Sequence, residues 1–283
     1  MSTTDPAAPQ LVVDDLHVRF RTPQRIVHAV RGVSFTVGRE KIGIVGESGS
    51  GKSTVGRAIL RLTAPNATVS ATRMAFQGTD LAGASERAML KVRGRRIGMI
   101  MQDPRYALDP VMRVGEQIGE ALDGRGLSAA ERRAKVMAML HAVRIRNPER
   151  VYDLYPHEVS GGMGQRIMIA MMLLPEPDLM IADEPTSALD VTVRMQVLAI
   201  LDELVTSRGL GLLFISHDLN LVAGFCDRVL IMYAGRIVEE CRAADLAAAK
   251  HPYTRGLLAS LPRIESRQDR LSVLQRDPAW LEA

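Results

Sequence analysis

The sequence is poor in cysteine and in aromatic residues. Its 283 residues include two cysteines, Cys226 and Cys241, and 4% aromatic residues. Two cysteines so far apart exclude a disulfide framework and a Cys-x-x-Cys metal site, so a reducing cytoplasm is the expected setting. Few aromatic rings are present on which nucleobases would stack, which argues against a nucleic-acid-binding protein.

The sequence also contains no long stretch of apolar residues. The longest apolar stretch, Ile167–Leu174, is much shorter than the ~18 residues that a membrane-spanning helix requires. The first ten residues, MSTTDPAAPQ, contain neither a basic region nor an apolar segment, so we expect no secretory signal. The six histidines lack the spacing of metal ligands.

The excess of positive over negative charge is also small. The net charge is +4, from 36 basic and 32 acidic residues. The densest basic patches, 93–96 and 131–135, are interpreted as solvated faces rather than nucleic-acid contacts.

Glycine is concentrated in a stretch that fits G-x-x-x-x-G-K-[ST]. Its residues are Gly46, Glu47, Ser48, Gly49, Ser50, Gly51, Lys52, Ser53 and Thr54. An apolar run, Ile42–Val45, precedes it and helically spaced apolar residues follow, so we expect a strand, a phosphate-binding loop and a helix. In such a loop, backbone N–H groups and the helix N-terminus bind a polyphosphate. Lys52 would then reach the β- and γ-phosphates, and the Ser53 hydroxyl would hold Mg²⁺.

Upstream of this loop, apolar residues in Leu11–Phe20 and Val27–Val37 predict a strand and then a strand pair broken at Gly32. These strands indicate a small β-subdomain. Phe20 either stacks on an adenine ring or is a core residue of its strand; both interpretations stay open. Downstream of the loop, residues 63–70 are interpreted as turn-rich, and Leu81–Arg96 as a helix.

Polar side chains follow three predicted buried strands. Gln102 follows Ile97–Met101, and the side chain of Gln102 would reach a metal ion or cap the strand. Asp183 and Glu184 follow Leu179–Ala182; Asp183 would lie near the metal, and Glu184 would polarise the attacking water. His217 follows Gly211–Ser216 and is a candidate ligand of the γ-phosphate.

Between these strands lies a helical block, Val114–Tyr155, with the expected segments Glu116–Leu122, Ser128–Val143 and Pro148–Leu154. Ser128 and Glu131 form a capping box at the start of the second segment. A long helix ending at Leu174 follows Val159–Met163. Val229–Tyr233 and Gly235–Glu239 are expected to form a hairpin.

Together these motifs resemble the ATP-binding subunit of an ABC transporter over roughly residues 10–262. The phosphate loop resembles Walker A, and 179–184 resembles Walker B. Gln102 matches the Q-loop, Val159–Met163 the signature, 187–190 the D-loop and His217 the switch histidine. Met101–Pro104, Leu108–Pro110 and His251–Arg255 are similar to segments of the oligopeptide, dipeptide and nickel importer group.

The resemblance implies an α/β P-loop NTPase (RecA-like) core with an N-terminal antiparallel β-subdomain. It also implies a helical subdomain inserted at about 104–170, and a C-terminal tail, 263–283. ATP and Mg²⁺ would bind at Walker A, with Ser53, Gln102 and Asp183 as metal ligands and Glu184, His217 and Gln102 as catalytic residues. Ser160, Gly161 and Gly162 of the signature would bind the ATP held by a facing ATPase.

The implied partners are a second ATP-binding subunit in a heterodimer, two permease subunits and an extracytoplasmic substrate-binding protein. No nucleic acid is implied. The chain would be peripheral, on the cytoplasmic face of the inner (plasma) membrane. The alternatives are an exporter ATPase and a soluble ABC ATPase that acts on nucleic acid or ribosomes.

Two departures from the family pattern are present. The signature has Val159 and Met163 where the family generally has leucine and glutamine. The tail lacks the cysteines that many members of the importer group carry, so we expect no iron–sulfur cluster.

Overall fold

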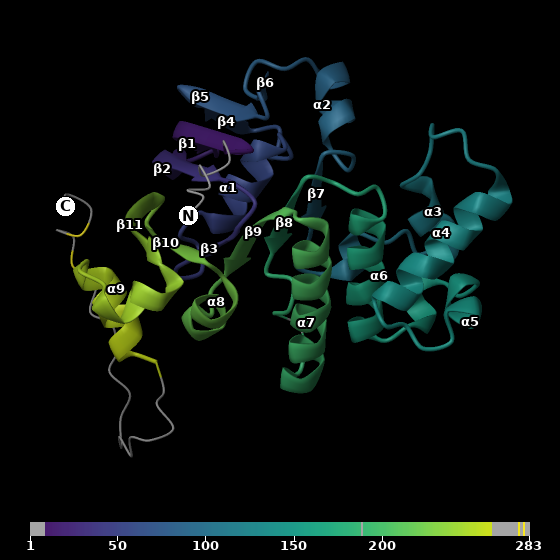
Figure 1. Cartoon of the computed structure of the whole chain (residues 1–283). Coiled ribbons are helices and arrows are strands. Elements are labelled where there is room, and N and C mark those ends of the chain that lie inside the picture. Colours follow the sequence, from purple (N-terminus) through teal and green to yellow (C-terminus); the bar gives the residue numbers. More distant parts are fainter. Residues whose placement is uncertain (1–8, 188, 262–276, 278–279, 281–283) are drawn as a thin grey trace, which may run out of the picture. The chain divides into compact units, whose positions relative to one another are not determined.

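The structure is a computed structural model that describes residues 9–187, 189–261, 277 and 280. The chain divides into two compact units, of which unit 1 comprises Met1–Ala84 and Leu213–Ala283, and unit 2 comprises Ser85–Leu212. Figure 1 labels the α-helices and the strands of both units.

Unit 1 contains an antiparallel sheet with the strand order β2-β1-β5-β6, in which β4 also pairs with β1. Its strands are β1 (Leu11–Arg21), β2 (Ile26–Val37), β4 (Ala67–Ser70), β5 (Arg73–Phe76) and β6 (Thr79–Asp80). The alternate residues Leu11, Val13, Leu16 and Val18 of β1 are buried, with an irregularity at 14–15. The N-terminal β-subdomain expected from the sequence is thus present.

The predicted break at Gly32 is wrong, because β2 runs without interruption from Ile26 to Val37. The pairing of β1 with β2 shifts register between Val13 and Leu16 and again between Leu16 and His17. Asp15 and Gly32 adopt positive φ angles of 51° and 71° at these shifts. Bulges therefore absorb the extra residues, and the ladder continues on both sides of them.

Two further segments differ from the predictions. The turn-rich segment 63–70 ends in strand β4, which pairs with β1. The helix expected over Leu81–Arg96 is confined to α2 (Glu86–Val92). Asp80 accepts hydrogen bonds from the N–H groups of Ala82 and Gly83, which forms a turn before the helix, and Ser85 caps the helix. Aspartate and serine favour such turns and caps over a helix interior.

Unit 1 also carries a second group of strands in the order β11-β10-β3-β9, of which β9 begins at Gly211 in unit 2 and belongs to unit 1 from Leu213 on. The strand β3 (Lys41–Val45) runs parallel to β10 (Arg228–Tyr233), and β10 forms an antiparallel hairpin with β11 (Arg236–Arg242). This hairpin was predicted. The remaining elements are β9 (Gly211–Ser216), α1 (Lys52–Ile59), α8 (Leu219–Phe225), η3 (Ala243–Ala248) and α9 (Pro252–Ala259).

In unit 2, β7 (Ile97–Ile100) pairs in parallel with β8 (Leu179–Asp183). Its other elements are η1 (Pro104–Tyr106), α3 (Val114–Glu120), α4 (Ala129–Ala142), α5 (Pro148–Tyr152), η2 (Pro156–Glu158), α6 (Gly161–Leu173) and α7 (Val191–Arg208). Helix α3 packs against α4, α5 and α6, so the predicted helical block folds as a cluster. The predicted capping box is also present, since Ser128 and Glu131 each bond to the other's backbone N–H.

Across residues 9–187 and 189–261, none of the helices combines the length and hydropathy needed to cross a bilayer. The C-terminal tail expected at 263–283 falls outside the described residues except for Asp277 and Trp280. The domain boundaries expected from the sequence stay a prediction.

Candidate nucleotide-binding and hydrolysis site

The phosphate loop connects the end of β3 to the start of α1. Gly51 is the N-cap of α1, with a φ angle of 105°. A Cβ atom at Gly51 would lie 2.5 Å from the carbonyl oxygen of Ala29, and one at Gly46 would lie 2.0 Å from that of Met232. Both positions therefore require glycine, because larger residues would collide with neighbouring backbone.

The side chain of Lys52 is buried within the loop. Lys52 is 4% exposed, and its Nζ atom donates hydrogen bonds of 2.8 Å to the carbonyl oxygens of both Gly46 and Glu47. Ser53 and Thr54 follow in the first turn of α1, where the backbone N–H groups of a helix attract anions. A buried ammonium group at a helix N-terminus is suited to bind a polyphosphate.

His217 and Phe20 are the other site candidates in unit 1. His217 is exposed directly after β9, between Ser216, which accepts a hydrogen bond from the Asp218 N–H, and Asp218, which caps α8. Phe20 is half-buried on β1 opposite Val27 and Ala67. The phosphate contact of His217 and the adenine stacking of Phe20 stay predictions.

Unit 2 brings Gln102 and Glu184 together. The Nε2 atom of Gln102 donates to Oε2 of Glu184 at 3.4 Å. Asp183 ends β8 and is 2% exposed, whereas Glu184 is half-buried and has a φ angle of 48°. A non-glycine residue in this region is strained, and such strain is found where function requires a particular orientation.

The signature residues form the start of α6. Ser160 caps this helix, and its Oγ atom accepts a hydrogen bond of 3.4 Å from the N–H of Met163. A Cβ atom at Gly162 would lie 2.7 Å from Cγ1 of Val193, so this glycine lets α6 approach the first turn of α7 closely. Gly161 is exposed, and a Cβ atom there would meet nothing within 4 Å, so its backbone is accessible. This helix start has the geometry of an anion site.

The predicted site residues are thus found in both units. Lys52, Ser53 and His217 belong to unit 1; Gln102, Asp183, Glu184 and the signature belong to unit 2. A catalytic centre that joins the two groups stays a prediction. Sequence reasoning missed one contact within unit 1: the Tyr253 hydroxyl accepts a hydrogen bond of 3.1 Å from the Glu47 N–H. The two residues are 206 positions apart, and no spacing rule connects them.

The oxygen-bearing side chains in this set are the type that Mg²⁺ prefers. Ser53, Gln102 and Asp183 offer a hydroxyl, an amide and a carboxylate, all hard oxygen ligands. Mg²⁺ usually retains water and phosphate ligands, so one carboxylate suffices. The residues present therefore fit the expected metal. In the described part of the chain, no group of three or more His, Cys, Asp or Glu residues is arranged to hold a metal ion.

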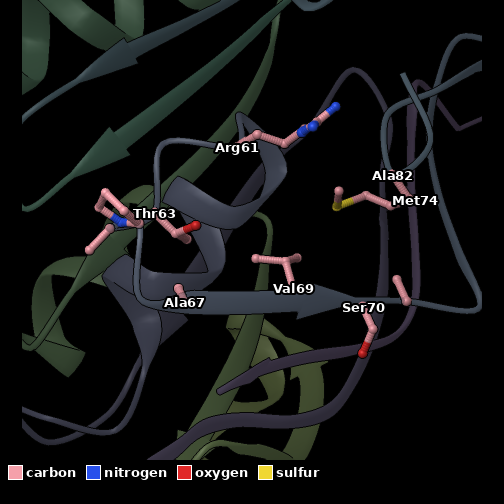
Figure 2. A pocket seen from close by; sticks show the side chains of 10 residues that line it. Arg61, Thr63, Ala67, Val69, Ser70, Met74 and Ala82 are labelled. Atoms are coloured by element: carbon pink, nitrogen blue, oxygen red, sulfur yellow. The ribbon is translucent and has the colours of Figure 1, made fainter. Parts of the chain in front are cut away.

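A separate pocket of about 330 Å³ lies in unit 1 beside α1 and β4 (Figure 2). Arg61, Thr63, Val69 and Met74 are among its lining residues. None of the predicted site residues lines it, and the guanidinium group of Arg61 donates to the carbonyl oxygen of Ala84. The pocket is therefore distinct from the phosphate loop.

Comparison with known proteins identifies the family. Residues 30–187 match the family described as ABC transporter. The chain belongs to the ABC transporter family. It is 49% identical over 267 residues to the "Probable peptide ABC transporter ATP-binding protein y4tR" of Sinorhizobium fredii, a match that spans 92% of this chain and 79% of the relative. It is 44% identical over 286 residues to the oligopeptide transport ATP-binding protein OppD of Salmonella typhimurium, spanning 98% and 85% of the two chains.

The fold of the chain matches that of a solved structure, the dimeric ATP-binding cassette MJ0796 bound to ADP and Pi, with a TM-score of 0.73. The two are 25% identical, and the match covers 82% of this chain and 98% of the cassette. These comparisons confirm the family and fold class predicted from the sequence. The chain is an ABC ATPase, with ATP as its substrate and the P-loop NTPase fold.

Proposed function

We propose that the chain is the ATP-hydrolysing subunit of a binding-protein-dependent importer of peptides or a related small solute such as a nickel chelate. The observation that carries this proposal is the match over nearly the whole chain to ATP-binding proteins named for peptide transport. Their names favour import over the exporter and the soluble nucleic-acid or ribosome ATPase. We further propose a peripheral location on the cytoplasmic face of the plasma membrane.

The residues of the site divide the chemistry among them. Lys52 and the N–H groups of the phosphate loop bind the β- and γ-phosphates. Ser53, Gln102 and Asp183 hold Mg²⁺, which neutralises charge on the phosphates. Glu184 orients and polarises the attacking water, and His217 contacts the γ-phosphate. Catalysis by this set rests on positioning and charge stabilisation.

A second ATPase supplies the opposing half of each site in this proposal. The start of α6, with the Ser160 cap and the accessible backbone at Gly161, has the geometry to bind the ATP of a facing subunit. The Ser-Gly-Gly-Met signature resembles one of two ATPase types that this importer group pairs. We infer a heterodimer on two permease chains, supplied by an extracytoplasmic binding protein. The absence of an iron–sulfur cluster stays an expectation, as does the absence of nucleic acid.

The surface of unit 2 beside the signature is suited to a protein partner. A pocket of about 300 Å³ is lined by residues that include Pro104, Leu108, Pro156, Val159 and Ser160. Next to it, Tyr106 and Val111 are 84% and 82% exposed. Large apolar side chains exposed beside a pocket are typical of an interaction site. We propose that this surface contacts the permease and transmits closure of the ATPases to it.

The proposal is tested by ATP turnover per chain, measured against protein concentration with and without the second ATPase and the permeases. We expect the isolated chain to be largely monomeric and a poor ATPase, because each ATP lacks the opposing signature. Co-expression with the partners should raise the turnover. A transport-competent complex with two copies of this chain and no second ATPase would contradict the heterodimer. High turnover at concentrations where the chain is monomeric would contradict the need for an opposing signature.

A further inference from the structure

The C-terminal helix α9 contacts the phosphate loop directly. The Oη atom of Tyr253 accepts the 3.1 Å hydrogen bond from the backbone N–H of Glu47, the second residue of the loop. Tyr253 is 0% exposed, so water does not compete with its hydroxyl for this N–H. A neutral hydrogen bond of this kind contributes a net ~1 kcal/mol when buried.

Several contacts fix the position of Tyr253. Its own N–H donates to Nδ1 of His251, the N-cap of α9. The carboxylate of Glu239 on β11 accepts hydrogen bonds from the N–H groups of Lys250 (2.6 Å) and His251 (3.3 Å). The start of α9 is therefore tied to β11, next to which it is drawn in Figure 1.

The ring of Tyr253 lies in an aromatic cluster. Its centroid is 4.4 Å from that of Tyr233 and 5.8 Å from that of Trp280, and the rings of Tyr233 and Trp280 are also 5.8 Å apart. Tilted and edge-on pairs at these separations are favourable. The cluster thus limits the directions in which the Tyr253 hydroxyl can point.

The turn after Tyr233 contacts the same loop. Gly235 donates its N–H to the carbonyl oxygen of Ser50 at 2.9 Å, and the carbonyl oxygen of Met232 lies against Gly46. The phosphate loop is therefore supported by β10, by this turn and by α9, all within unit 1.

The Glu47 residue connects Tyr253 to Lys52. Its N–H is held by the Tyr253 hydroxyl, and its carbonyl oxygen accepts a hydrogen bond from Nζ of Lys52. A shift of Glu47 would therefore displace one of the two carbonyl groups that orient the Lys52 ammonium. We propose that Tyr253 is a positioning residue for the phosphate loop, so that helix α9 is a functional part of the nucleotide site. This rests on the proposed role of Lys52 in binding phosphate.

The test compares Tyr253→Phe with a matched control, Tyr233→Phe, in the full chain. Both variants lose one hydroxyl from the same aromatic cluster, but in the part of the chain that the structure describes it is the Tyr253 hydroxyl that bonds to the phosphate loop. We expect Tyr253→Phe to raise the dissociation constant of ATP roughly five-fold, the equivalent of one net hydrogen bond. Tyr233→Phe should change the dissociation constant of ATP by about two-fold or less, which is the usual size of effect for a substitution that removes no such contact.

Two readouts separate positioning from a general structural role. In the assembled complex, Tyr253→Phe should raise KM for ATP and leave kcat unchanged, with an unfolding midpoint close to that of Tyr233→Phe. A lower midpoint and a lower kcat at unchanged KM would overturn the proposal. Equal ATP affinities in the parent and both variants would also overturn it.

Amide hydrogen exchange at Glu47, measured without nucleotide, tests the contact independently of ATP binding. The Tyr253→Phe variant should exchange this amide faster than the parent, and Tyr233→Phe should not. Unchanged exchange in Tyr253→Phe would overturn the proposal. Failure of the parent chain to bind ATP would instead refute the proposed role of the loop, while the exchange rates would still decide whether Tyr253 holds Glu47.

Discussion

Replacement of Lys52 by alanine should abolish useful ATP binding while the chain stays folded. Lys52 is 4% exposed, and its Nζ atom is oriented by two hydrogen bonds of 2.8 Å within the loop. A unit charge about 4 Å from a phosphate oxygen contributes about 4 kcal/mol at an effective dielectric constant of about 20. This corresponds to a loss of roughly 10³-fold in affinity.

The assay is calorimetric titration of the full chain with ATP and Mg²⁺. Arg57→Ala is the matched control, because Arg57 lies exposed in the last turn of the same helix and its loss changes the net charge equally. We expect the control to bind ATP nearly as the parent does. If folded Lys52→Ala binds ATP within about ten-fold of the parent, Lys52 does not supply the main attraction for the phosphates, and another group binds them.

Three further predictions follow from particular residues. Glu184→Gln should bind ATP normally but lower the turnover of the assembled complex by about 10²–10⁴-fold, because an amide does not accept the proton of water. The control is Glu176→Gln, since Glu176 also has a positive φ angle but is exposed, and near-normal turnover of Glu184→Gln would assign the activation of water to another residue. Gly43→Ala should lower the free energy of unfolding by about 1–3 kcal/mol, because its Cβ would lie 2.1 Å from Cγ1 of Val222. In denaturant titrations, adding Val222→Ala should restore part of this free energy, and a double variant whose loss is the sum of the two single losses would contradict the clash. Burial, with a smaller effect of Asp227, raises the pKa of the Cys226 thiol to about 12. At pH 8 a thiol reagent should therefore label Cys226 only when the chain unfolds, and labelling of Cys226 in the folded chain at the rate of the unfolded chain would contradict this.

Sequence motifs predicted the parts of the fold whose conformation depends on residue types at fixed, short spacings. Gly46 and Gly51 of the phosphate loop lie where a backbone carbonyl oxygen would come within 2.0 Å and 2.5 Å of a Cβ atom, so the close packing of the loop explains why the motif has glycine at these two positions. The capping box at Ser128 is likewise present, since both of its hydrogen bonds join residues three apart.

The missed elements depend on partners distant in the sequence. The strand β2 continues past Gly32 because β1 supplies a complementary bulge, which no pattern within β2 reveals. The short strands β4 and β5 have too few residues to show a period, and they form by pairing with β1. The contact between Tyr253 and Glu47 was likewise not predicted, because the two residues are 206 positions apart in the sequence.

The candidate site was predicted residue by residue, and the family assignment is confirmed. The catalytic roles of Gln102, Glu184 and His217 were inferred from their positions after buried strands, and these roles stay predictions. The structure adds the strained backbone of Glu184 and its hydrogen bond from Gln102, both of which depend on tertiary structure.

In the proposed function, ATP hydrolysis by this chain drives peptide import. The most direct test is peptide uptake by vesicles that contain this chain, the second ATPase and the two permeases, with the peptide-loaded binding protein on the opposite side of the membrane from ATP. We expect uptake that requires ATP and that stops with Glu184→Gln in this chain. Uptake of equal rate with Glu184→Gln, or ATP turnover in the complete complex with no peptide movement, would contradict it.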